Sequence, residues 1–84
     1  MKVQAEISIY PLRTKSVSEP IKEFCKILRF HGLEIKTTAM STFIKCESRG
    51  LFKACDEAFE QLAKKHEVVM NMKVSNACPL DRPN

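Results

Sequence analysis

KVQAEISIY, residues 2–10, alternates apolar and polar side chains over its whole length. The apolar side holds Val3, Ala5, Ile7 and Ile9, and the polar side holds Gln4, Glu6, Ser8 and Tyr10. A period of two residues is typical of a β-strand that buries one face and leaves the other open. We therefore predict a half-buried strand over Lys2–Tyr10, which Pro11 ends, followed by a loop over residues 12–17.

Two helices are predicted downstream of this strand. Ser18, Glu19 and Pro20 are typical of a helix start, since a short polar side chain can cap free N–H groups and proline tolerates the first turn. One face of this helix is predicted from apolar residues at helical spacing, namely Ile21, Phe24, Cys25 and Leu28. Gly32 is predicted to end the helix in a left-handed conformation. A second helical repeat follows Ser48, Arg49 and Gly50 and includes Leu51, Phe52, Cys55, Ala58, Phe59 and Leu62.

Three further strands complete the pattern. Leu33–Thr38 and Thr42–Glu47 are rich in β-branched residues and predict a hairpin, and Val68–Ser75 alternates as a fourth strand. The order strand, helix, strand, strand, helix, strand predicts a single domain over residues 1–84 of the ferredoxin-like α+β class. Its four-stranded antiparallel sheet has the order 4132, with both helices on one face.

The second face of that sheet is left without helices, and we call it the open face. If Ile7, Ile9, Ile44, Cys46, Met70 and Met72 point toward the helices, the open face carries Glu6, Ser8, Tyr10, Phe43, Lys45, Glu47, Asn71 and Lys73. Carboxylates, a hydroxyl and aromatic rings in one patch suit a small cationic aromatic molecule, because rings stack and carboxylates accept hydrogen bonds. The alternatives are a solvated surface and a contact between subunits.

Composition restricts the class of protein further. The 84 residues carry a net charge of +4 with acidic and basic residues interspersed, which is weak evidence for nucleic-acid binding. No apolar run approaches 18 residues, so we expect no membrane span. The start MKVQAEISIYPLR lacks the apolar core of a secretory signal, so a cytoplasmic location is expected. The four cysteines show no CxxC spacing or clustering with histidine, so we expect reduced thiols and no metal site.

Two other classes of protein share the predicted topology. RNA-recognition domains stack bases on an aromatic-rich third strand, but here that strand reads STFIKCE with one aromatic residue. Acylphosphatase-like enzymes hold phosphate with an arginine in the loop after the first strand, where Arg13 lies, but that loop contains no glycine. Anion binding by Arg13 and Lys15 stays open. We expect no catalysis, since no nucleophile has a histidine at a motif spacing.

Several segments together resemble the thiamine-binding protein family. They are AEISIYPL at 5–12, PI with a following F at 20–24, LRFHGLEI at 28–35, MSTFIKCE at 40–47 and VSNACPL at 74–80. The chain departs from the family pattern where glycines are common, with Thr37 and Thr38 before the hairpin turn and Cys46 in the third strand. The cysteine is expected to fill a gap between helix and sheet, and the threonines could alter the shape of a binding site.

The resemblance implies binding of thiamine, or of its hydroxymethylpyrimidine half, without chemistry and without a cofactor. The protein would serve as a carrier, store or sensor and would assemble as a homotetramer built from dimers. Carried over by position, the implied ligand-binding residues are Glu6, Ser8, Tyr10, Met40, Ser41, Thr42 and Glu47. The alternative is a structural or interaction module whose open face serves subunit packing alone.

The chain end SNACPLDRPN, residues 75–84, is interpreted as a strand terminator. Asn76 can hold a local turn through its side chain, and Pro79 prevents further strand pairing. In the family this corner would lie near a subunit contact. Cys78 is expected to be the most exposed thiol.

Overall fold

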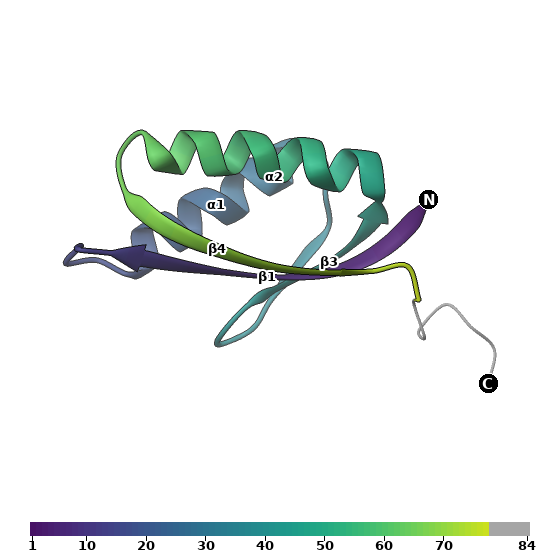
Figure 1. Ribbon diagram of the computed structural model, residues 1–84, viewed down its shortest axis with the longest axis horizontal. Coiled ribbons are helices and arrows are strands. Elements are labelled where there is room, and N and C mark those ends of the chain that lie inside the picture. The colour runs from purple at the N-terminus through teal and green to yellow at the C-terminus, as the bar shows by residue number, and fades with distance from the viewer. Residues whose placement is uncertain (78–84) are drawn as a thin grey trace.

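The computed structural model describes residues 1–77 and shows a four-stranded sheet with two helices on one side (Figure 1). The elements are β1 (Lys2–Leu12), α1 (Ser18–Phe30), β2 (Ile35–Thr37), β3 (Thr42–Glu47), α2 (Ser48–Ala63) and β4 (Glu67–Ser75). The strand order is β2-β3-β1-β4, and each neighbouring pair is antiparallel. The predicted ferredoxin-like α+β fold and strand order are confirmed.

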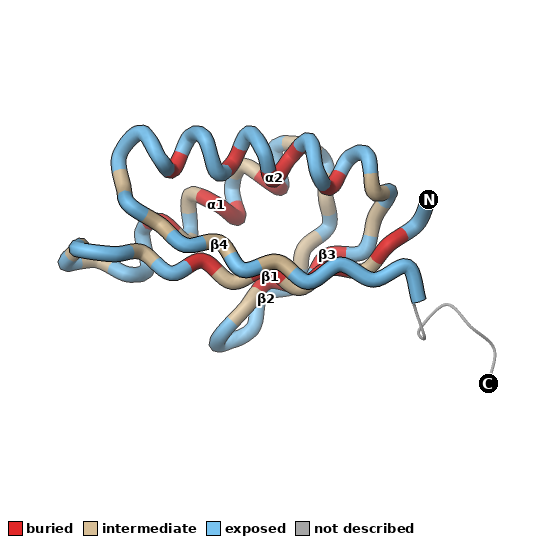
Figure 2. Tube along the Cα trace, in the orientation of Figure 1, coloured by how far each residue is buried: buried red, intermediate tan, exposed pale blue. Residues whose placement is uncertain are grey.

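The core lies between the sheet and the two helices, where the buried positions of the chain gather (Figure 2). Its apolar members include Val3, Ala5, Ile7, Ile9 and Ile44 from the sheet, Phe24 and Leu28 from α1, and Leu51, Ala54, Cys55, Ala58 and Leu62 from α2. Full burial of a large apolar side chain contributes about 1.5–3 kcal/mol, so the alternation in β1 directs one face of the strand toward the helices. Neither helix within residues 1–77 is long and apolar enough to span a membrane.

The first strand continues through Pro11, contrary to the prediction that this proline ends it. Pro11 lies opposite Val68 of β4, whereas the register of β1 with β3 ends at Ile7. Within the described residues this part of β1 therefore pairs with β4 alone. A proline on an unpaired strand edge is tolerated because its missing N–H removes no hydrogen bond from the sheet.

The start of α1 also differs from the predicted cap. Its N-cap residue is Val17 and makes no side-chain cap bond, while the Oγ of Ser16 accepts a long hydrogen bond of 3.4 Å from the N–H of Glu19. The capping role predicted for Ser18 is wrong, because Ser18 is already the first helical residue. At the other end Gly32 has φ 80°, which confirms its left-handed conformation.

Three other boundaries move by a few residues. Helix α2 begins at Ser48, directly after β3, and the N–H of Ser48 donates to the carbonyl of Met1 at 2.9 Å. Strand β2 is shorter than predicted, and β4 begins one residue earlier, at Glu67. After β4 the Oγ of Ser75 accepts from the N–H of Ala77 at 2.9 Å, so Ser75 makes the local bond predicted for Asn76. The predictions on Cys78 and Pro79 lie outside the described residues.

Candidate functional site

The connection between β2 and β3, residues 38–41, extends past the sheet on the side opposite the helices (Figure 1). The side chain of Thr38 organises this turn: its Oγ1 accepts from the N–H groups of Met40 at 3.3 Å and Ser41 at 3.0 Å. The backbone N–H of Thr38 donates to the Ser41 carbonyl at 2.8 Å. A threonine hydroxyl therefore holds the turn at a place where the family pattern often has glycine.

Two hydrogen bonds attach this turn to the open face of β1. The Oγ of Ser41 donates to Oε2 of Glu6 at 2.9 Å, and the Oγ of Ser8 donates to the Met40 carbonyl at 3.2 Å. Both bonds lie close to the point where β1 and β3 cease to pair, at Ile7. The turn thus forms a wall beside the polar side of β1.

Strand β4 supplies the opposite wall. Lys73 lies opposite Glu6 in the β1–β4 register and Asn71 lies opposite Ser8, and the Nζ of Lys73 is 3.8 Å from Oε1 of Glu6. The space between the walls, which we call the Glu6 hollow, has a volume of about 290 Å³. It is lined by Glu6, Ser8, Tyr10, Met40, Ser41, Asn71 and Lys73. Ligand pockets commonly measure about 300–1,000 Å³, so the volume of the hollow lies just below that range.

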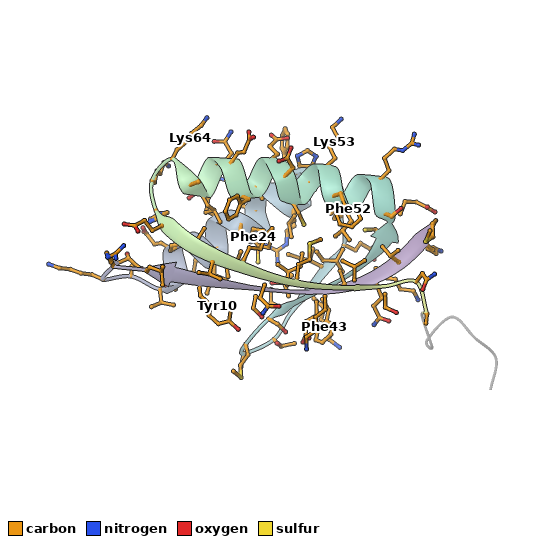
Figure 3. All side chains as sticks on the ribbon, viewed as in Figure 1. Tyr10, Phe24, Phe43, Phe52, Lys53 and Lys64 are labelled. Atoms are coloured by element: carbon orange, nitrogen blue, oxygen red, sulfur yellow. The ribbon has the colours of Figure 1, made fainter. Side chains whose placement is uncertain are left out.

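The lining of the Glu6 hollow offers several kinds of contact at once. Glu6 provides a carboxylate whose side chain is 35% exposed, and the serines and Asn71 provide donors and acceptors. The side chain of Tyr10 points away from the helices, as Figure 3 shows, and 49% of the residue is exposed. A half-exposed ring beside a carboxylate can stack on a flat cationic ring and balance its charge.

The structure brings five of the seven predicted ligand-binding residues to this hollow: Glu6, Ser8, Tyr10, Met40 and Ser41. It does not bring Thr42 there, because Thr42 is buried on the helix side, with its Oγ1 3.7 Å from Sγ of Cys25. Thr42 lines a cavity of about 80 Å³ between the turn and α1, a volume well below that of a common ligand pocket.

Glu47 also lies away from the hollow, at the far end of β3 opposite Lys2. Its Oε2 accepts a hydrogen bond of 2.9 Å from the amino group of Met1. That bond and the positive charge of the amino group lower the pKa of the Glu47 carboxyl below its usual value. The open face therefore holds Glu6 and Glu47 in separate surroundings, although the sequence places both on it.

Asn71 and Lys73 line the hollow but are absent from the predicted binding set. The period of two residues in the fourth strand predicts that both lie on the open face, but it gives them no contacts. The signal that could have found them is the pairing of β1 with β4, since Ser8 and Glu6 lie directly opposite them.

The loop after β1, where an anion site stayed open, has a different arrangement. A hollow of about 550 Å³ lies between residues 12–14 and residues 63–67. The guanidinium of Arg13 forms an ion pair with the carboxylate of Glu67. The arginine charge is thus already balanced by a neighbouring acid. Separately, no group of three His, Cys, Asp or Glu side chains within residues 1–77 is placed to hold a metal ion.

Comparison with known proteins now identifies the family. Residues 5–78 match the family model described as thiamine-binding protein. The chain belongs to the thiamine-binding protein family. A search among curated proteins finds no match.

Solved structures with a similar fold come from several organisms. A hypothetical protein of Methanocaldococcus jannascii is 30% identical with a TM-score of 0.84, and the match covers 99% of this chain and 86% of that one. A Streptococcus pneumoniae protein is 20% identical with a TM-score of 0.86, covering 96% and 92%. A candidate thiamine biosynthesis/salvage protein of Thermotoga maritima is 16% identical with a TM-score of 0.80, covering 89% and 83%. The last two matches support the fold alone.

The departure at Cys46 can be interpreted against the thiamine-binding family pattern. Cys46 is partly buried and packs against the core cluster between the sheet and the helices, as expected for a residue that fills a gap there. Burial, together with the negative charge of Glu47, raises the pKa of its thiol. The cysteine thus acts as a small apolar side chain in the core.

Proposed function

We propose that the protein binds thiamine, or its hydroxymethylpyrimidine half, in the Glu6 hollow without chemical conversion, and serves as a carrier, store or sensor. One observation supports this most: a carboxylate positioned by Ser41 lies in the same hollow as an exposed tyrosine ring. Membership of the thiamine-binding family agrees with that ligand class.

The two halves of thiamine suit different parts of the lining. The aminopyrimidine carries an amino donor and ring nitrogen acceptors, for which Glu6, Ser8 and Asn71 offer partners. The thiazolium carries a permanent positive charge, which a carboxylate and the face of Tyr10 can stabilise. Because Glu6 is held by the hydroxyl of Ser41, less side-chain freedom is lost when a ligand binds.

Calorimetric titration and thermal shift test this function. Thiamine, hydroxymethylpyrimidine and thiamine phosphates are titrated into the purified protein, and we expect saturable binding of at least one of them with a rise in Tm. Absence of binding and of any Tm change with all three would remove the proposal.

A second function is favoured by the apolar side chains around the hollow. Tyr10, Phe43 and Val69 all lie on the open face and are 36–49% exposed. A structural module would bury these side chains against another subunit, in a homo-oligomer that we propose to be a tetramer built from two dimers. If the same oligomer forms in ligand-free protein that binds none of the three compounds, the structural function is preferred.

A further inference from the structure

Lys73 gives the Glu6 hollow a positive charge that a site for a simple cation does not need. It reaches the hollow from β4, opposite Glu6 in the register, and its Nζ lies 3.8 Å from Oε1 of Glu6. The carboxylate that would bind a cationic ring therefore already has an ammonium beside it. A ligand with positive charge alone would compete with Lys73 for Glu6 and would be repelled by it.

The rest of the open face shows the same balance of charge. Within the paired positions of residues 1–77, the open face carries the lysines Lys2, Lys36, Lys45 and Lys73 and the glutamates Glu6, Glu47 and Glu67. Each glutamate has a cationic partner: Lys73 for Glu6, the Met1 amino group for Glu47 and Arg13 for Glu67. The described part of this face thus offers no carboxylate without a cation beside it.

Lys73 is also free to move within the hollow. Its side chain is 80% exposed, and an exposed ion pair contributes little to stability because water screens it. The ammonium can therefore leave Glu6 at small cost when a ligand enters. Its flexible stem would carry the charge to the rim of the hollow, where Asn71 of the same strand adds an amide donor.

From these contacts we propose that the hollow selects the phosphate monoester of its ligand, with Lys73 binding the phosphate and Glu6 binding the amino or cationic end. The inference rests on the proposed function, because it names which form of a thiamine-like ligand binds best. A phosphate carries about −1.5 to −2 charges at neutral pH and accepts hydrogen bonds strongly, which suits a lysine acting as a point charge. A ligand that carries both charges would separate Lys73 from Glu6 and would form an ion pair with each of them.

The test compares thiamine with thiamine monophosphate by calorimetry at low ionic strength, using the wild-type protein, Lys73→Gln and Lys36→Gln. Lys36 lies on the same open face but on β2, away from the hollow, so its substitution is the matched control. We expect the monophosphate to bind about tenfold more tightly than thiamine to the wild type and to Lys36→Gln, from one charge-assisted contact. Lys73→Gln should remove this preference: it should weaken binding of the monophosphate and strengthen binding of thiamine, because it removes the ammonium that competes with thiamine for Glu6. The unfolding midpoint of each variant confirms that it is folded.

Several results would overturn the inference. Equal affinity for thiamine and its monophosphate in the wild type contradicts it while the proposed function survives. A preference that persists in Lys73→Gln and is lost in Arg13→Ala moves phosphate recognition to the loop after β1. Inorganic phosphate that competes as well as the ester shows a general anion site instead. Failure of both compounds to bind the wild type refutes the proposed function and this inference with it.

Discussion

At the scale of single residues, Glu6 and Glu47 show how the same side chain can have different roles on one face of a sheet. Glu6 lies in a hollow with Ser41 and Lys73, whereas Glu47 lies at the end of β3 and bonds to the chain's amino group. Sequence reasoning could place both on the open face from the period of two. It could not separate them, because their partners come from segments distant in the sequence.

This difference gives a prediction for ligand affinity. Glu6→Gln should weaken thiamine binding about 10- to 100-fold, since a hydrogen bond to a charged group contributes about 1.5–3 kcal/mol. Glu47→Gln makes the same chemical change at a glutamate outside the hollow, so it should leave the dissociation constant of thiamine unaltered. Calorimetric titration of both variants measures this. A larger loss in Glu47→Gln than in Glu6→Gln would place the ligand at the other end of the face.

Cys55 gives a prediction for stability against pH. Burial, with a smaller contribution from the charge of Cys46, raises the pKa of its thiol from 9.0 to about 11. Because the folded state holds the proton more tightly than the unfolded state, this stabilisation is complete below pH 9 and is lost as pH rises toward 11. The free energy of unfolding should therefore fall by at most about 1.4 kcal/mol per pH unit over that range.

Urea denaturation of the wild type and of Cys55→Ala between pH 8 and pH 11 checks this expectation. The variant lacks the thiol, so the difference between the two proteins isolates its titration from that of other groups. We expect the advantage of the wild type to shrink steadily above pH 9. A difference that stays constant across the range would contradict a raised thiol pKa.

At the scale of elements, the helices and strands were predictable because each has a strong period, but their ends were not. Pro11 stays within β1 because β3 no longer pairs there, and helix α2 starts at Ser48 with its N–H bonded to Met1. Both outcomes depend on neighbours in space. The turn at 38–41 is similar, since the hydroxyl of Thr38 holds it and no glycine marks it in the sequence.

The role of Thr38 predicts an effect of its substitution. Thr38→Val keeps the shape of the side chain but removes an acceptor for the N–H groups of Met40 and Ser41. We expect a loss of about 0.5–1.5 kcal/mol in stability, from the bonds of an exposed hydroxyl. Thiamine binding should also weaken, because the turn would no longer hold Ser41 against Glu6.

Urea unfolding and hydrogen exchange measure these changes, with Thr37→Val as the matched control one residue away. The amide protons of Met40 and Ser41 should exchange faster in Thr38→Val alone. If both variants lose the same stability and the two amides stay protected in both, Thr38 does not organise the turn.

At the scale of the whole molecule, the arrangement of layers leaves two very different surfaces. The helices cover one face of the sheet, and the open face displays Tyr10 and Phe43, whose side chains point away from the helices (Figure 3). The period of each strand was enough to predict which residues share this face. The hollow itself was only partly predictable, because its walls depend on the β1–β4 register and on the turn at 38–41.

The proposed oligomer can be tested by changing one aromatic residue on each surface. Phe43→Glu puts a charge on the open face and should lower the mass measured by light scattering, since an unpaired charge is costly in an interface. Phe52, on α2 and 53% exposed, serves as the control, and Phe52→Glu should keep the wild-type mass. Dissociation by Phe52→Glu alone would assign the subunit contact to the helices.

The most direct test of binding at the Glu6 hollow is a nuclear magnetic resonance titration of the isotope-labelled protein with thiamine, which follows every backbone amide at once. We predict that the largest shifts gather at Glu6, Ser8, Ser41, Asn71 and Lys73, with little change at Glu47. Shifts centred on residues 12–14 and 63–67, or no shifts at saturating thiamine, would contradict the account.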